Sequence, residues 1–168
     1  MKRFLVLLGV LVLMLGMNAY AEGDVSEGYV FYENELFSTE VPADWSIQKV
    51  ETVQNSYAQM DAPHEGSIGT WCMITFSAHG FEDSEIEELE ASYDFEHKFY
   101  ETTLAGQSAK VIEYEIELGG TVQRAIYTST PSGQRFVLHF RCPKGDTAYD
   151  FSPIQEIMDH FIDHIQWK

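Results

Sequence analysis

The stretch from Ala109 to Cys142 constrains the fold more than any other, because it predicts three antiparallel strands joined by two tight turns. Between Ile112 and Leu118, apolar residues alternate with glutamates, which is the period of two expected of a strand whose two faces meet different environments. Gly119-Gly120 then predicts a two-residue hairpin loop, since such loops need positive φ. With Leu118 opposite Thr121, we expect Glu115 to form a cross-strand ion pair with Arg124.

The second turn decides how many faces of this sheet must be covered. Pro131-Ser132-Gly133 predicts a three-residue loop that ends in a bulge with glycine in the left-handed region. Thr130 then faces Gln134, which places Phe136, Leu138 and Phe140 with Val122 and Ile126, opposite the face of Ile112, Tyr114 and Ile116. A two-residue loop would slip the register by one and gather all of them on one face. We favour the first register, which predicts a sheet that needs cover on both sides.

The N-terminus has the pattern of a secretory signal peptide. Lys2 and Arg3 precede an apolar run from Phe4 to Met17, and Ala19-Tyr20-Ala21 has the small-x-small form of a cleavage site. We therefore expect residues 1–21 to be removed, residues 22–168 to form a single domain, and the protein to be periplasmic or secreted without stable membrane insertion.

The charge of the chain limits its partners. The formal net charge is −17, and it becomes −19 when Lys2 and Arg3 leave with the signal peptide. Such a surface repels nucleic acid, whose binding depends on basic residues. The acid excess is explained by solubility, or alternatively by attraction to a basic partner or to cations.

The segment that opens the mature chain carries a family resemblance. An aromatic hairpin is predicted around Asn34-Glu35, Pro42 ends its second strand, and another strand begins near Trp45. The sequence YENELFSTEVPADWSIQKVE resembles the opening of PsbP-like domains and of bacterial secreted proteins related to them. The later Ala105-Gly106-Gln107 turn, the three-strand segment and a closing helix that ends in Ile165-Gln166-Trp167-Lys168 follow in the same order.

The resemblance implies a fold and little about function. It implies an α/β/α sandwich around a central antiparallel sheet, and two helices are predicted that could provide the outer layers. The first follows a capping-box pattern at Ser84 and Glu87, and the second follows Ser152-Pro153 with a broad apolar stripe. We expect the two helices to cover opposite faces of the sheet. Photosynthetic members of the family assist the oxygen-evolving photosystem, but the basic docking surface of those members is not recognisable here.

The segment from Thr52 to Thr70 is the least regular part of the chain. Pro63, Gly66 and Gly69 interrupt it, and irregular segments of this length are often functional or mobile. A ligand site would have its rim here, with Tyr57, Met60 and His64 as candidate residues. The alternative is a flexible surface loop without a ligand.

Cys72 and Cys142 are the only cysteines in the chain. Export permits a disulfide between them, which would stabilise the fold by up to about 4 kcal/mol in the chain-entropy model. Two separate buried thiols are the alternative, because strand adjacency is not readable from one sequence.

The run Asp159-His160-Phe161-Ile162-Asp163-His164 places two histidines at i and i+4, a spacing that can present two nitrogens to one metal. A glutamate beside the first histidine and a third ligand downstream are absent, so we interpret this run as a solvated helix face. Asp159, His160, Asp163 and His164 remain candidate metal ligands.

No pattern for a catalytic residue or a cofactor is recognisable in the sequence. We therefore expect a non-enzymatic accessory or binding domain that contacts another envelope or secreted component. The alternative is a small secreted hydrolase that uses the 52–70 loop, with His64 and Asp61.

Overall fold

The computed structural model describes residues 25–51, 56–64, 71–78, 86–87, 91, 97–116 and 120–168. The predicted signal peptide, residues 1–21, lies outside the described residues. Within them, no helix has the length and hydropathy needed to cross a membrane.

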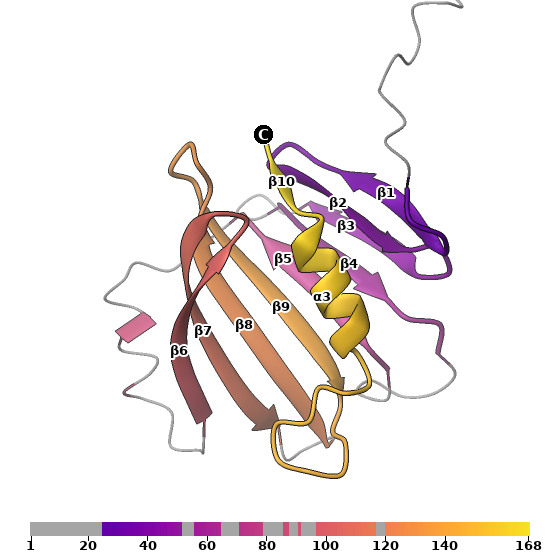
Figure 1. The fold of residues 1–168 in the computed structure, drawn as a ribbon, viewed down its shortest axis with the longest axis vertical. Helices are drawn as coiled ribbons and strands as arrows, with labels where there is room; N and C mark the ends of the chain where they lie inside the picture. The colour runs from indigo at the N-terminus through magenta and orange to yellow at the C-terminus, as the bar shows by residue number, and fades with distance from the viewer. Residues whose placement is uncertain are drawn as a thin grey trace, which may run out of the picture.

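Two antiparallel sheets and the helix α3 (Gln155–Asp163) make up the described fold (Figure 1). The small sheet has three strands in the order β1-β2-β10, and the large sheet has seven in the order β3-β4-β5-β9-β8-β7-β6. The strands are β1 (Tyr29–Glu33), β2 (Phe37–Pro42), β3 (Ser46–Glu51), β4 (Ser56–Asp61), β5 (Met73–Ser77), β6 (His97–Leu104), β7 (Gln107–Ile116), β8 (Thr121–Ser129), β9 (Arg135–Pro143) and β10 (Gln166–Trp167).

The main core lies on one face of the large sheet. Alternate residues of β8 and β9 point into it, and α3 and the small sheet lie over them. The Thr39 hydroxyl of β2 donates to the Phe161 carbonyl of α3 at 2.8 Å, which ties the two covering elements together. At the centre is Phe37, fully buried, whose ring meets the rings of Phe76, Phe136, Phe161 and Trp167 at centroid distances of 4.9–6.3 Å.

The opposite face of the large sheet carries a smaller cluster. Its buried members are Ile86, Ile112, Ala125, Tyr127 and Val137. The face assignment made from the sequence is therefore confirmed: Leu138 pairs with Ile126, and both lie on the face opposite Ile112.

The second turn of the central hairpins is also confirmed. The amide of Thr130 donates to the Gln134 carbonyl at 2.7 Å, and Gly133 has a φ of 84°. In the preceding hairpin the predicted register is wrong by two residues. Ile116, not Leu118, pairs with Thr121, so Glu113 rather than Glu115 faces Arg124, with 2.7 Å between Glu113 Oε1 and Arg124 Nε. A shift of two leaves every side chain on its predicted face.

The α/β/α sandwich predicted from the sequence is wrong. The described structure is mostly β, and the predicted hairpin of residues 29–41 forms a separate sheet with β10 instead of joining the central one. The predicted closing helix ends at Asp163, and Gln166 and Trp167 form a strand that pairs with β2. Of the predicted helix after Ser84, Ile86, Glu87 and Ala91 are described and are helical.

The central position of Phe37 leads to a prediction for stability. Phe37→Ala should lower the free energy of unfolding by about 3–5 kcal/mol, because it removes a buried ring and leaves a cavity among five other aromatic rings, Tyr32 included. Phe31→Ala is the matched control, since the Phe31 side chain is 55% exposed. Urea denaturation of both variants measures the difference, and equal losses would contradict the described core.

Candidate functional site

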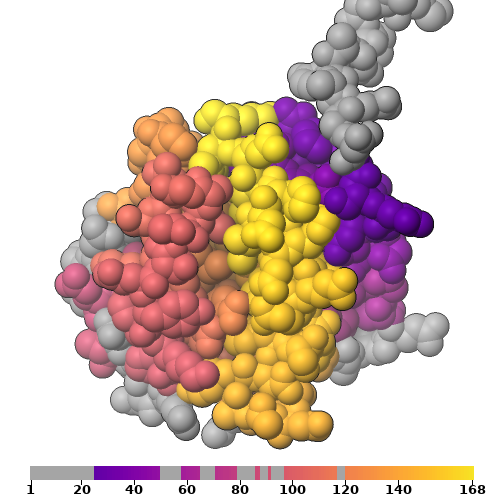
Figure 2. All heavy atoms as spheres, viewed as in Figure 1, coloured from indigo at the N-terminus to yellow at the C-terminus, as the bar shows by residue number. Residues whose placement is uncertain are grey.

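The segment that follows β9 forms one wall of an open groove of about 740 Å³ beside the N-terminal end of α3. Arg124 of β8 and Phe151 line the groove, and their side chains stack with 4.5 Å from the guanidinium carbon to the ring centroid. Figure 2 shows the surface hollowed between the yellow helix and the red strands β6 and β7. Arg124 is held by the buried Glu113, whose other carboxylate oxygen lies 4.0 Å from Lys98 Nζ.

Carboxylates line the outer part of this groove. Glu156 and Asp159 lie on the exposed side of α3, and Asp150 lies on the loop that faces it. The backbone amide of Ser152 donates to Asp150 Oδ1 at 2.9 Å and that of Asp146 to Oδ2 at 3.1 Å, and these bonds hold the pKa of Asp150 below its ordinary value. Asp150 is therefore ionised at neutral pH and shapes the loop at the same time.

Glycine at position 145 permits this loop, because a Cβ there would collide with the Asp150 carboxylate. A second anchor is Glu115, which accepts hydrogen bonds from Lys144 Nζ at 2.6 Å and from the Tyr149 amide at 2.8 Å. The bond from Lys144 is the main reason that the pKa of Glu115 lies below its ordinary value. The wall of the groove is thus fixed to β7 by a charged pair.

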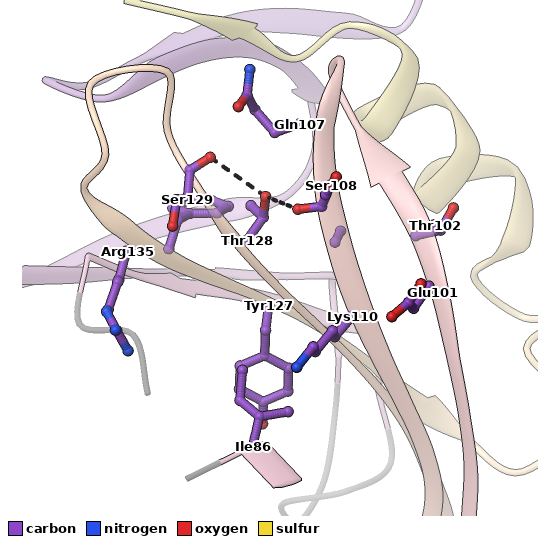
Figure 3. Close-up of a pocket in the computed structure, with 12 residues that line it drawn as sticks. Ile86, Glu101, Thr102, Gln107, Ser108, Lys110, Tyr127, Thr128, Ser129 and Arg135 are labelled. Atoms are coloured by element: carbon purple, nitrogen blue, oxygen red, sulfur yellow. Dashed lines mark hydrogen bonds between the residues drawn. The ribbon is translucent and has the colours of Figure 1, made fainter. Parts of the chain in front are cut away.

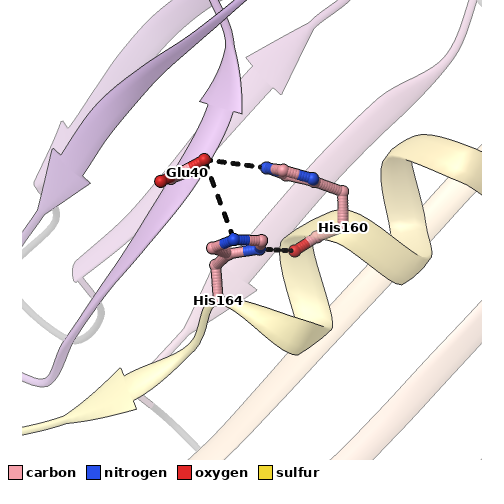
Figure 4. Close-up of side chains that lie close together, drawn as sticks. All are labelled: Glu40, His160 and His164. Carbon is pink, nitrogen blue, oxygen red and sulfur yellow. Dashed lines mark hydrogen bonds and ion pairs between the residues drawn. The ribbon is translucent and has the colours of Figure 1, made fainter. Parts of the chain in front are cut away.

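A second polar cluster lies at the interface between α3 and the small sheet (Figure 4). Glu40 of β2 is buried, and its Oε2 lies 2.9 Å from Nε2 of His160 and 3.9 Å from Nε2 of His164. Burial alone would raise the pKa of the Glu40 carboxyl, but hydrogen bonds from Ser26 and His160 outweigh it and hold the pKa below its ordinary value.

Two of the four candidate ligands named from the sequence meet in this cluster, and the other two do not. Asp159 instead accepts from Gln155 Nε2 at 2.7 Å on the exposed side of α3, and Asp163 is exposed. Sequence reasoning missed Glu40. No local signal could have found it, since it precedes His160 by 120 residues and lies in a strand whose residues are all buried.

The candidate ligand segment contains a strand that the sequence analysis did not predict. Residues 56–61 form β4, while 52–55 and 65–70 lie outside the described residues. Met60 is fully buried and belongs to the core, and Tyr57 pairs with Val50 and Ser77 through the backbone. Met60 is therefore a packing residue.

His64 lies next to this strand and is exposed. Its ring stacks on Trp71 at a centroid distance of 3.7 Å, and Trp71 Nε1 donates to Asp61 Oδ1 at 2.9 Å. Gln59 Nε2 donates to the same buried carboxylate. Asp61 is thus engaged by two neutral donors, and the hydrolase that would use His64 and Asp61 stays a prediction.

A second hollow, of about 530 Å³, lies against the edge of the large sheet around β6, β7 and β8 (Figure 3). Thr128 Oγ1 donates to the Ser108 carbonyl at 2.7 Å inside it, and Lys110 Nζ lies 3.9 Å from Glu87. Polar groups that line this hollow are thus engaged by other groups of the protein.

Cys142 lies in β9, and Cys72 comes directly before the neighbouring strand β5. Met73 of β5 pairs with Arg141 of β9, so one residue further Cys72 comes opposite Cys142. Both thiols are free in this structure; Cys142 is fully buried and Cys72 partly so. Burial, and next the nearby Cys72, raise the pKa of Cys142 to about 12. The predicted disulfide between them stays a prediction.

Comparisons with known proteins do not show a family. No protein-family model matches this chain, and no curated protein matches it significantly, so the PsbP-like resemblance stays a prediction. One solved structure with a similar fold is LpqN of Mycobacterium tuberculosis, involved in cell envelope biogenesis. It is 16% identical, with a TM-score of 0.48 over 88% of this chain and 93% of LpqN.

A protein of Bacteroides thetaiotaomicron VPI-5482 is also similar, at 18% identity and a TM-score of 0.43 over 79% of this chain. This chain spans 45% of the length of that protein. Similarity at these levels concerns the backbone fold alone.

Removal of the Glu115 anchor gives a prediction about pH. A carboxyl whose pKa is lower in the folded state adds stability that is present above its unfolded pKa and is lost as pH falls through the folded pKa. Glu115→Gln should therefore be less stable than the unsubstituted protein at pH 7, and the difference should shrink as pH falls below 4.5, the ordinary value. Urea denaturation across this pH range measures it, with Glu35→Gln in an exposed turn as the control. A difference that does not depend on pH would contradict the ion pair.

The two cysteines should differ in reactivity. The thiolate is the reactive species, so the buried Cys142 with its pKa of about 12 should react with a disulfide reagent only after unfolding. Reduced, folded protein should show one thiol that reacts slowly, and unfolded protein should show two reactive thiols. Cys72→Ser should remove the thiol that reacts in the folded protein. Protein that yields no thiol even when unfolded, until reductant is added, contains the predicted disulfide.

Proposed function

We propose that this chain is an exported, non-enzymatic binding domain, and that its acidic groove docks a basic segment of another envelope or secreted protein. The single observation that carries the proposal is the groove beside α3, an open concave surface of about 740 Å³ lined by Asp150, Glu156 and Asp159. The N-terminal pattern of Lys2, Arg3 and the apolar run that follows supports export.

Charge complementarity supports a basic partner. The chain has a formal net charge of −17, which raises the local concentration of cations and of basic peptides and repels polyanions. Within the groove the three carboxylates face one arginine, and that arginine is already paired with Glu113. A lysine or arginine of a docked segment would therefore meet unneutralised acid.

The shape of the groove supports an extended segment. Its acids come from a helix on one side and from an anchored loop on the other, so their spacing is fixed before binding.

Paired substitutions with the same charge change test this proposal. The probe is a fluorescently labelled ten-residue peptide of alternating lysine and alanine, and binding is followed by fluorescence anisotropy at low salt. The double variant Glu156→Gln/Asp159→Asn should weaken binding about tenfold, which corresponds to about 1.4 kcal/mol for two lost charge contacts. Added salt should weaken it further.

The control is Glu35→Gln/Asp44→Asn, which removes two exposed acids from turns of the small sheet and its neighbour. It should leave the affinity within about twofold, because exposed charges away from the contact are screened. If the two double variants lose affinity equally, only net charge matters and the groove is not the docking site.

A further inference from the structure

The cluster of Glu40, His160 and His164 offers one carboxylate oxygen and two imidazole nitrogens that all lie within 4.8 Å of one another. The fold brings them together from distant parts of the chain. His160 lies in α3 and His164 is the C-cap residue one turn later. Glu40 points at them from β2, which the Thr39–Phe161 hydrogen bond fixes against the helix (Figure 4). The cluster does not depend on the proposed function, which concerns the groove.

The spacing of the three atoms suits a small cation. Zinc lies about 2.0–2.2 Å from imidazole nitrogen and carboxylate oxygen, so the ligand atoms of a tetrahedral site are roughly 3.4 Å apart. The distances from Glu40 Oε2 to Nε2 of His160 and His164 are 2.9 and 3.9 Å, and they lie on either side of that value. The two imidazole rings are stacked at a centroid distance of 4.0 Å, so binding requires them to turn out of this stack until both Nε2 lone pairs point at the ion.

The His164 ring has a hydrogen bond that fixes its tautomer. Nδ1 of His164 lies 2.8 Å from the His160 carbonyl oxygen, which can only accept, so Nδ1 carries a proton. In the neutral ring, Nε2 then has its lone pair directed at the Glu40 carboxylate. Donation from the second ring nitrogen to a backbone carbonyl is the usual support of a metal-binding histidine.

The His160 ring has its own support. It is stacked between Tyr29, at a centroid distance of 3.6 Å, and His164, at 4.0 Å. Both rings therefore keep their Nε2 atoms toward Glu40 without a metal, which lowers the ordering cost of binding.

An ion pair accounts for only part of this arrangement. A single hydrogen bond joins His160 and Glu40, but His164 Nε2 lies 3.9 Å from the same oxygen, too far for a hydrogen bond. When the His164 ring is neutral, its Nε2 lone pair faces this carboxylate oxygen across 3.9 Å, and a cation between the two atoms would be bound by both.

We propose that Glu40, His160 and His164 form a binding site for a divalent transition metal of the zinc class. Two nitrogens and one carboxylate oxygen match the ligands of such metals, whereas calcium and magnesium prefer oxygen alone. The metal takes the place of the proton between His160 Nε2 and Glu40: a neutral His160 ring carries that proton on Nδ1 instead, and an imidazolium releases it to solvent. Three protein ligands leave a fourth position for water or for an atom of a partner.

Zinc titration of the purified protein tests the site directly. Isothermal calorimetry with ZnCl₂ should show one saturable site. His164→Ala should weaken it about tenfold or more, since even the loss of a supporting group around a metal has effects of that size. This substitution is suited to the test because the His164 side chain is 38% exposed, so the variant should fold. Glu40→Gln keeps the size of the side chain and should also weaken binding.

His64→Ala is the matched control, because His64 is exposed and lies outside the cluster. Its zinc affinity should equal that of the unsubstituted protein. Circular dichroism of each variant checks folding, and the visible spectrum of bound Co²⁺ should show mixed nitrogen and oxygen ligation in a four-coordinate site. The absence of a saturable site, or equal affinity in His164→Ala and His64→Ala, would overturn the proposal.

Discussion

The cover over the apolar face of the large sheet is the constraint on which the rest of the structure depends. Alternate residues of β8 and β9 present a mostly apolar surface, and α3, with nine residues, is too short to cover it alone. The small sheet covers the remainder, and Phe37 fills the space where the two covering elements meet the sheet. Because burial of apolar surface drives folding, this shared cover positions α3 against β2 and so places the Glu40 cluster.

The parts of the fold that depend on local pattern could be predicted from the sequence. Alternation placed Leu138 and Ile112 on opposite faces, and Pro131-Ser132-Gly133 identified its turn. The register of the β7–β8 hairpin could not be fixed in the same way, because the alternation Ile-Glu-Tyr-Glu is unchanged by a shift of two. The pairing that prevails buries Glu113 with Arg124 and leaves Glu115 to anchor the following loop.

The division into two sheets has no local signature. A strand that is buried along its whole length, as β2 is, has the same pattern in a central sheet as in a separate covering sheet. The same limit applies to the cluster at the helix. Its two histidines have a recognisable spacing, but the carboxylate arrives through tertiary packing, so a search for a third ligand near them in sequence could not succeed. In the sequence, Glu156 and Asp159 likewise have the pattern of an ordinary solvated helix face. The groove that they line exists only in the folded protein, where the loop lies opposite them.

The pairing of β10 with β2 has a consequence for how the chain reaches this structure. Gln166 pairs with Ser38, so the small sheet is completed by residues from nearly opposite ends of the described chain. Contacts between such distant segments form slowly, because the entropy of closing the intervening chain is lost before the contact is gained. Until these contacts form, the apolar face of β9 is uncovered and can associate with other incompletely folded molecules. The yield of refolded protein should therefore depend more on the protein concentration during renaturation than on the free energy of unfolding of the native protein.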